Sequence, residues 1–137
     1  MYVQPYLFFN GRCEEAVKYY QQHLGAKLNA LMRYKEAPPG DGLAAQANGE
    51  QIMYCNFTVG DSVVMASDDC VNPNTKFEGF SLSLSVTDTA EADRVFAALA
   101  DGGAVHVSLS KTFFSPYFGM VVDRFGISWM VIIQHQA

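Results

Sequence analysis

The chain has 137 residues, of which half are hydrophobic and 17% are charged, and 14 acidic against 9 basic residues give a net charge of -5. This length suits one domain or two small fused modules, and the apolar content excludes a disordered chain. No cluster of Lys and Arg is present, which argues against nucleic acid as a partner because grouped basic side chains bind phosphate backbones.

The first predicted elements are a strand and a helix. Residues 2–9 are aromatic and β-branched and stop at Asn10-Gly11, a pattern typical of a strand that ends in a turn. The following segment predicts a helix that begins near Gly11 or Arg12 and ends at Gly25. Its apolar face contains Ala16, Tyr20, His23 and Leu24.

Three strands and a loop complete the first half. Residues 27–34 predict a strand, and the Pro- and Gly-rich residues 36–49 predict a loop. Residues 52–59 and 62–66 predict two strands joined by a hairpin turn at Gly60-Asp61. Residues 69–78 are the best candidate for a linker.

The second half repeats this order. Residues 79–86 predict a strand. Asp88 and Glu91 form a capping box that predicts the N-terminus of a helix, and Gly102-Gly103 predicts the end of that helix. The apolar stripe of the helix contains Ala92, Val95, Phe96, Leu99 and Ala100. Further strands are expected over 104–110, 117–122 and 127–133, with Asp123-Arg124-Phe125-Gly126 as the last turn.

The two halves therefore predict an α+β fold made of two tandem βαβββ modules, residues 1–68 and 79–137. Segment Glu15 to Tyr20 also matches Glu91 to Phe96 by residue type, which indicates an internal duplication. Each module would cover one face of its curved mixed sheet with a helix and leave the other face as an open cup for a ligand.

Two strings, PYLFFNGRCEEAVKYYQQHLGA and KTFFSPYFGMVVDRFGISWM, carry a family resemblance. With the repeated modules, they resemble the vicinal oxygen chelate superfamily of glyoxalase, bleomycin-resistance and dioxygenase proteins, and within it the PhnB-like branch. The branch is often labelled 3-demethylubiquinone-9 3-methyltransferase-like. A typical methyltransferase binds S-adenosylmethionine on a Rossmann sheet with a Gly-rich turn, and this chain has no G-x-G-x-x-G.

The resemblance also implies where metal ligands would lie. Metal-using members of the superfamily hold the ion with His and Glu, and the four matching positions here are Pro5, Met65, Ser81 and Met130. None of these offers imidazole or carboxylate, so we expect neither a metal nor another cofactor. Some PhnB-like relatives have a His where this chain has Tyr54.

The candidate ligand-binding residues lie on a strand and in a loop. Ser81, Ser83 and Ser85 alternate with aliphatic residues, so they share one face of a strand, where they would bind a ligand or ordered water. The aromatic segment 111–120 would close the cup or form a dimer contact. The predicted set comprises Met65, Ser81, Ser83, Lys111, Phe113, Phe114, Tyr117 and Met130.

The cysteines and the ends of the chain complete the predictions. Cys13, Cys55 and Cys70 are widely spaced without a CxxC, which favours free thiols, and Cys13 is interpreted as structural or as a nucleophile. No apolar run approaches the roughly 20 residues of a membrane helix. The N-terminus lacks a signal peptide, so we expect a cytoplasmic protein without a membrane partner.

Two classes of function follow. The first is a metal-free homodimer that binds a small organic molecule, with the excess apolar composition used at the dimer interface. The alternative is a metal-dependent lyase, isomerase or dioxygenase of the same superfamily. A methyltransferase is less favoured, and a dimeric structural protein with vestigial cups is a third possibility.

Overall fold

The computed structural model describes residues 1–37, 49–68 and 74–134. They fall into two units, Met1–Thr75 and Lys76–Ala137. Residues 69–73 of the predicted linker, with Cys70 among them, and most of the predicted loop 36–49 lie outside the described residues. The linker boundaries therefore stay a prediction.

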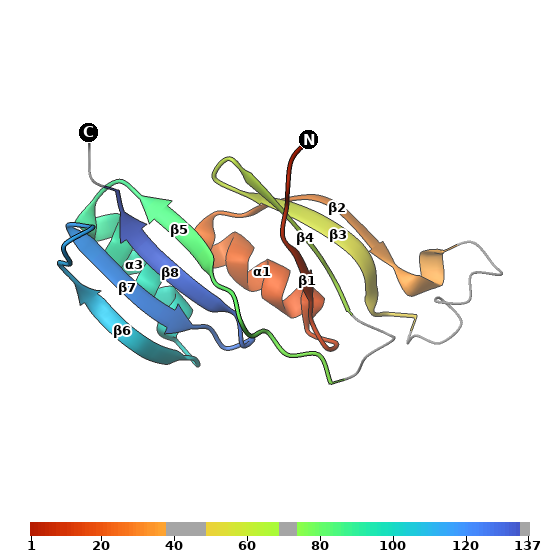
Figure 1. The fold of residues 1–137 in the computed structure, drawn as a ribbon. Coiled ribbons are helices and arrows are strands. Elements are labelled where there is room, and N and C mark those ends of the chain that lie inside the picture. Colours follow the sequence, from red (N-terminus) through yellow and green to blue (C-terminus); the bar gives the residue numbers. More distant parts are fainter. Residues whose placement is uncertain (38–48, 69–73, 135–137) are drawn as a thin grey trace. The chain divides into compact units, whose positions relative to one another are not determined.

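The first unit has a four-stranded sheet with helix α1 on one face (Figure 1). Its elements are β1 (Tyr6–Phe8), α1 (Cys13–Leu24), β2 (Lys27–Arg33), the 3-10 turn η1 (Tyr34–Glu36), β3 (Ile52–Val59) and β4 (Ser62–Ser67). The strand order is β1-β4-β3-β2, in which β1 pairs with β4 in parallel and the other pairs are antiparallel.

The second unit repeats this topology. Its elements are β5 (Leu82–Val86), α3 (Thr89–Ala100), β6 (Ala104–Ser110), β7 (Tyr117–Val122) and β8 (Ser128–Ile133). The strand order β5-β8-β7-β6, with β5 and β8 parallel, matches that of the first unit element by element. The predicted α+β fold of two βαβββ modules is confirmed.

The first strand is shorter than the sequence pattern predicts. The prediction covered residues 2–9, but β1 contains only Tyr6–Phe8. Pro5 has no backbone N–H to donate to a neighbouring strand, which limits how far the ladder extends. Residues 1–3 are exposed and outside the sheet.

The helices bury most of their predicted apolar stripes, while His23, Leu24 and Ala100, near the helix ends, are half-buried. In α1, Ala16, Val17 and Tyr20 are buried, and Gly25 ends the helix with a left-handed φ of 68°. In α3, the N-cap Asp88 accepts a hydrogen bond from the Glu91 N–H, which confirms half of the predicted capping box. The helices thus bury one face of each sheet.

Turns complete the hairpins. Gly60 and Asp61 connect β3 to β4, as predicted. The turn between β7 and β8 is built around the buried carboxylate of Asp123, which accepts hydrogen bonds from the Trp129 indole and the N–H groups of Phe125 and Ile127. Trp129 is buried, as expected for a core residue.

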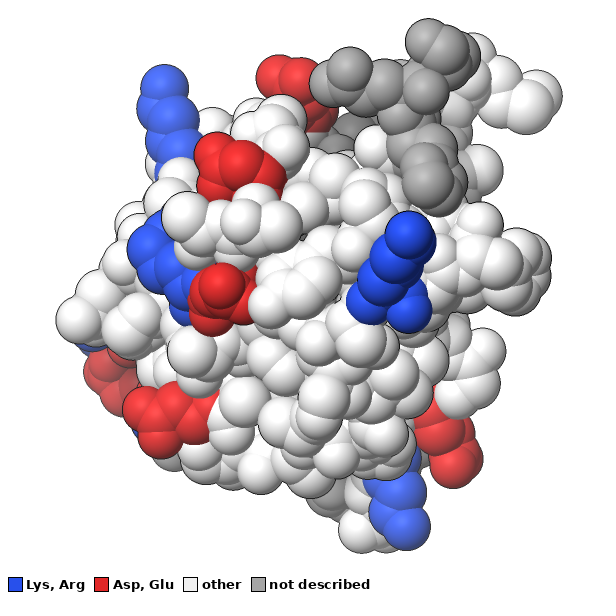
Figure 2. All heavy atoms as spheres, turned by 90° about the vertical axis from the view of Figure 1, so that its left-hand side faces the viewer, with Lys and Arg blue, Asp and Glu red and all other residues white. Residues whose placement is uncertain are grey.

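On the surface drawn in Figure 2, the basic side chains lie at separate places, one of them beside an acidic side chain, and they form no single basic patch on this face. Among the described residues, no helix is long and apolar enough to cross a membrane.

Candidate functional site

Within the described part of the second unit, helix α3 covers one face of the sheet and leaves the other face without a helix of that unit. Leu84, Val131 and Gly119 lie opposite one another on the adjacent strands β5, β8 and β7. A Cβ atom built on Gly119 would lie 2.7 Å from the Phe96 ring of α3, so these three positions face the helix. Because side chains alternate along strands, the neighbouring row of Ser83, Met130 and Met120 faces the opposite way.

We call this opposite surface the serine–methionine face, and it is lined by Ser81, Ser83, Ser85, Met120, Ser128 and Met130. The predicted residues Ser81, Ser83 and Met130 are thereby brought together on it. The Ser81 and Ser128 hydroxyls share a hydrogen bond of 2.6 Å, and the Ser85 hydroxyl accepts one from the Gln134 amide at 3.3 Å. The face thus combines hydroxyl groups with adaptable thioether side chains, which suit contact with an organic molecule.

The aromatic segment lies at the end of this face. Phe114 packs edge-on against Phe118 with ring centroids 4.9 Å apart. Phe118, Ile132 and Ser85 are neighbours across three adjacent strands, so their side chains point to the same side of the sheet. Because Ser85 lies on the serine–methionine face, Phe118 and the Phe114 ring packed on it extend that face. Phe114 is 42% exposed, and Phe113, 96% exposed, packs against Phe114. Both rings are available to a ligand or a partner.

A small hydrogen-bonded turn holds this aromatic segment. The N–H of Ser115 donates to the Thr112 hydroxyl, and the Thr112 N–H donates to the Ser115 carbonyl. The fully buried Ser115 hydroxyl also donates to the Ile133 carbonyl at 2.6 Å. The turn is therefore fixed to β8, and Lys111, before it, is exposed.

Tyr117 lies on the other side of the sheet. It lies two positions before Gly119 in β7, so its side chain points to the same side of the sheet as Gly119, toward α3. Its hydroxyl donates a hydrogen bond to the Asp93 carboxylate of α3 at 2.6 Å. This hydrogen bond raises the pKa of Tyr117, because it holds the phenol proton beside a negative charge. The structure separates Tyr117 from the serine–methionine face, because strand alternation turns it toward the helix.

The remaining predicted residue, Met65, lies on the uncovered face of the first sheet. It pairs with Tyr6 of β1 and Asn56 of β3, whereas the next pair, Ala66 and Cys55, is buried on the side of α1. The Met65 side chain is half-buried.

This uncovered face contains an aromatic cluster that the sequence analysis did not identify. The Tyr6 ring lies 4.9 Å from that of Phe8 and 6.5 Å from that of Tyr54 between centroids. The Asn56 amide donates to the Tyr54 hydroxyl at 3.0 Å. We call Tyr6, Phe8, Tyr54, Asn56 and Met65 the aromatic face. Tyr6 and Phe8 have the i, i+2 spacing of one strand face, and this was the available signal.

Burial modifies the chemistry of this face. Burial raises the pKa of Tyr6, and a hydrogen bond with Ser67 offsets part of the rise. The Tyr6 phenol is therefore neutral at physiological pH and offers a hydrogen-bond donor rather than a charge.

Metal ligands do not gather in the described ranges. In residues 1–37, 49–68 and 74–134, no three His, Cys, Asp or Glu side chains lie close enough to hold an ion. The His23 ring lies against that of Tyr19, with centroids 4.3 Å apart and planes tilted by 44°, and His106 is exposed on β6. The donor set at Pro5, Met65, Ser81 and Met130 does not fit zinc, nickel or iron.

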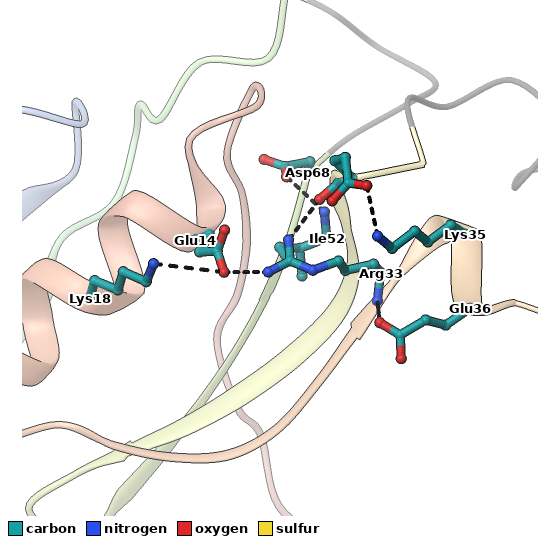
Figure 3. A network of polar contacts seen from close by, with 8 residues as sticks. Glu14, Lys18, Arg33, Lys35, Glu36, Ile52 and Asp68 are labelled. Atoms are coloured by element: carbon teal, nitrogen blue, oxygen red, sulfur yellow. Dashed lines mark hydrogen bonds and ion pairs between the residues drawn. The ribbon is translucent and has the colours of Figure 1, made fainter.

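Charged residues instead tie α1 to β2 and its following turn (Figure 3). Arg33 bonds the Glu14 carboxylate and the Glu50 carbonyl, and its own N–H donates to Glu36. The Arg33 hydrogen bond lowers the pKa of Glu14. The Glu50 carboxylate in turn pairs with Lys35 at 2.7 Å, so this network serves the architecture of the first unit.

The chain matches the family model described as 3-demethylubiquinone-9 3-methyltransferase over residues 2–132. It is 33% identical to protein YjdN of Escherichia coli K12, with 99% of this chain and 97% of that protein covered. The crystal structure of protein PA1353 from Pseudomonas aeruginosa is 41% identical, with a TM-score of 0.86 and 99% of each chain covered.

Two further structures extend this similarity. The PhnB protein of Bacillus cereus is 27% identical, with a TM-score of 0.80 and 97% of this chain and 99% of that one covered. A glyoxylase/bleomycin resistance protein/dioxygenase domain from Frankia has a TM-score of 0.71 at 12% identity, covering 100% of this chain and 93% of that one. The latter similarity shows a shared fold.

Proposed function

We propose that this chain, which belongs to the 3-demethylubiquinone-9 3-methyltransferase-like (PhnB-like) family, is a metal-free homodimer of the vicinal oxygen chelate superfamily that binds a small organic molecule. The observation that supports this most directly is the serine–methionine face. It presents hydroxyl and thioether groups on a sheet surface without a helix, with the exposed Phe114 ring at its end.

The composition of the two uncovered faces favours binding over catalysis. The aromatic face offers stacking surfaces and hydroxyl and amide groups, and the serine–methionine face offers hydroxyls and thioethers. Apolar walls with a few polar groups are typical of sites that recognise organic ligands. Lys111, before the aromatic turn, would favour a ligand that carries a negative charge.

Methyl transfer is not the reaction we propose, although the family carries that name. S-adenosylmethionine is usually bound on a doubly wound parallel sheet at a Gly-rich turn. Each described sheet here has a single parallel pair at one edge and antiparallel pairs elsewhere. A metal-dependent lyase, isomerase or dioxygenase is the second candidate, and the shared fold alone favours it.

The proposed dimer would cover surface that a monomer leaves exposed. Strand β6 is an edge of its sheet, and Val105 and Val107 on it are exposed. An uncovered edge strand with β-branched side chains is a site where chains associate. A second copy of the chain would cover such an edge.

Native mass spectrometry of gently purified protein tests the dimer and the metal together. We expect a species of twice the 15.1 kDa chain mass without a bound transition metal, and any co-purified ligand would add its own mass. Sedimentation at tens of micromolar should agree. A monomer would contradict the dimer, and about one zinc, nickel or iron per chain would favour the metal-dependent alternative.

Substitutions in the second unit test the binding face. Phe114→Ala is expected to weaken binding by about 1 to 3 kcal/mol, the usual cost of losing an aromatic anchor. Ser83→Ala should also weaken it, by about 1 kcal/mol for a lost hydrogen bond. The measurement is calorimetric titration with the best binder from a thermal-shift screen of planar aromatic carboxylates.

Matched variants separate the site from general effects. Phe80 is 45% exposed, close to the 42% of Phe114, but precedes β5, so Phe80→Ala should leave the affinity unchanged. Ser62→Ala, at the exposed start of β4, is the control for Ser83→Ala. If Phe114→Ala and Ser83→Ala bind like the wild type while remaining folded, the ligand does not occupy this face.

A further inference from the structure

Two cysteine thiols far apart in the sequence meet inside the first unit. Cys13 is the first residue of α1 and Cys55 lies in β3, 42 positions later, yet their sulfur atoms are 3.6 Å apart. Both side chains are fully buried. The contact depends on the packing of α1 on the sheet, which sequence spacing does not reveal.

The backbone around each thiol is held independently of the sulfur contact. The Cys13 N–H donates to the buried Asp68 carboxylate at 3.0 Å, which fixes the start of α1. Cys55 pairs with Ala66 in the middle of the sheet. The packing of α1 on the sheet, rather than the sulfur contact itself, therefore sets the positions of the two residues.

The pKa values of the two thiols are shifted in opposite directions. The hydrogen bond between the two sulfur atoms lowers the pKa of Cys55 and raises the pKa of Cys13. Burial and the Asp68 carboxylate act against a thiolate at either position. Cys55 is consequently the sulfur that ionises first, and Cys13 is the neighbouring thiol that remains protonated.

We propose that Cys13 and Cys55 are an oxidisable dithiol that hydrogen peroxide converts into an intramolecular disulfide. The Cys55 thiolate attacks one peroxide oxygen and breaks the O–O bond, which gives a sulfenic acid and hydroxide. The Cys13 sulfur then attacks the Cys55 sulfur, the S–O bond breaks, and the released hydroxide takes up the Cys13 proton as water. Overall, two thiols lose two electrons and two protons, and peroxide becomes two waters.

The required movement is small. A disulfide has its sulfur atoms about 2.05 Å apart, so the observed 3.6 Å must close by about 1.5 Å. Rotation of the two side chains with a slight shift of the first turn of α1 supplies this distance. The bond would close a loop between α1 and β3 and restrict the unfolded chain.

The test uses the 137-residue chain with Cys70→Ser, which leaves only Cys13 and Cys55 as thiols in it. The protein is treated with peroxide in the presence of glutathione, a thiol whose oxidation serves as the internal standard. We expect the mass of the monomer to fall by two hydrogens, as it does when one disulfide forms. Alkylation under denaturing conditions should then label neither cysteine until dithiothreitol is added. A peptide map should show one cross-linked peptide that contains both residues.

Single variants identify the roles of the two sulfurs. In the Cys70→Ser background, Cys13→Ser should stop at a Cys55 sulfenic acid that dimedone traps, whereas Cys55→Ser should react more slowly with peroxide. Circular dichroism checks that each variant is folded. The protein that retains both Cys13 and Cys55 decides the proposal even if a single variant does not fold. The proposal is overturned if its thiols can still be alkylated after all the glutathione is oxidised. It is also overturned if the cysteines are oxidised to sulfinic acid or form disulfides between chains.

Discussion

Replacing Asp68 with alanine is expected to lower the free energy of unfolding by about 3 kcal/mol, because two buried backbone donors lose their acceptor. One carboxylate oxygen accepts from the Cys13 N–H and the other from the Ile52 N–H, at 3.0 and 2.9 Å. Asp68 is 2% exposed, so water does not take its place without opening the structure. Urea denaturation at neutral pH measures the loss.

Two variants show whether acceptor geometry or charge matters. Asp68→Asn keeps the size but turns an NH2 group toward one of the N–H donors, so it should also destabilise the protein. Asp101→Ala removes a carboxylate that is 74% exposed and paired with Arg124, and it should cost less than about 1 kcal/mol. Equal losses in Asp68→Ala and Asp101→Ala would contradict the proposed role of burial.

The pH dependence gives a further readout of the same group. Burial raises the pKa of Asp68, and the backbone hydrogen bonds from Ile52 and Cys13 offset part of the rise. Because the folded-state pKa lies above the unfolded value of about 3.9, the folded state binds more protons between these two values. The contribution of Asp68 to stability therefore falls as pH rises through that window, and Asp68→Asn should remove this slope.

Much of the fold could be predicted because its signals are local. Apolar spacing located both helices, Gly25 and Gly60 marked a helix end and a hairpin, and the match between the two helices indicated the duplication. The alternation of side chains along β5 also predicted that Ser83 points away from the helix while the neighbouring Leu84 points toward it, and the strand register agrees. These features depend on neighbours within one element.

The parts that escaped prediction depend on register between distant segments. Tyr6 meets Tyr54 only because β1 and β3 flank β4, and Cys13 meets Cys55 only because α1 packs on β3. Tyr117 was assigned to the cup from its place in an aromatic run, but strand parity turns it toward Asp93. A single sequence contains no signal for such pairings, since each needs the three-dimensional arrangement of several elements.

The substitution Gly103→Ala is expected to destabilise the second unit by about 3 kcal/mol or more, comparable to strong overpacking of a core. Gly103 lies between α3 and β6, and a Cβ built there would be 2.0 Å from the Val122 carbonyl oxygen. That oxygen is backbone, and Val122 pairs with both Ala104 and Ser128, so the sheet must shift to make room.

A second glycine provides the comparison that isolates this close approach. Gly60 has a positive φ of 58° but nothing within 4 Å of a built Cβ, so Gly60→Ala should cost only about 1 kcal/mol for its left-handed backbone. Thermal unfolding of both variants, followed by circular dichroism, measures the difference. If the two lose the same stability, the turn before β6 does not approach β7 as closely as the structure indicates, and Gly103 would be replaceable like any turn residue.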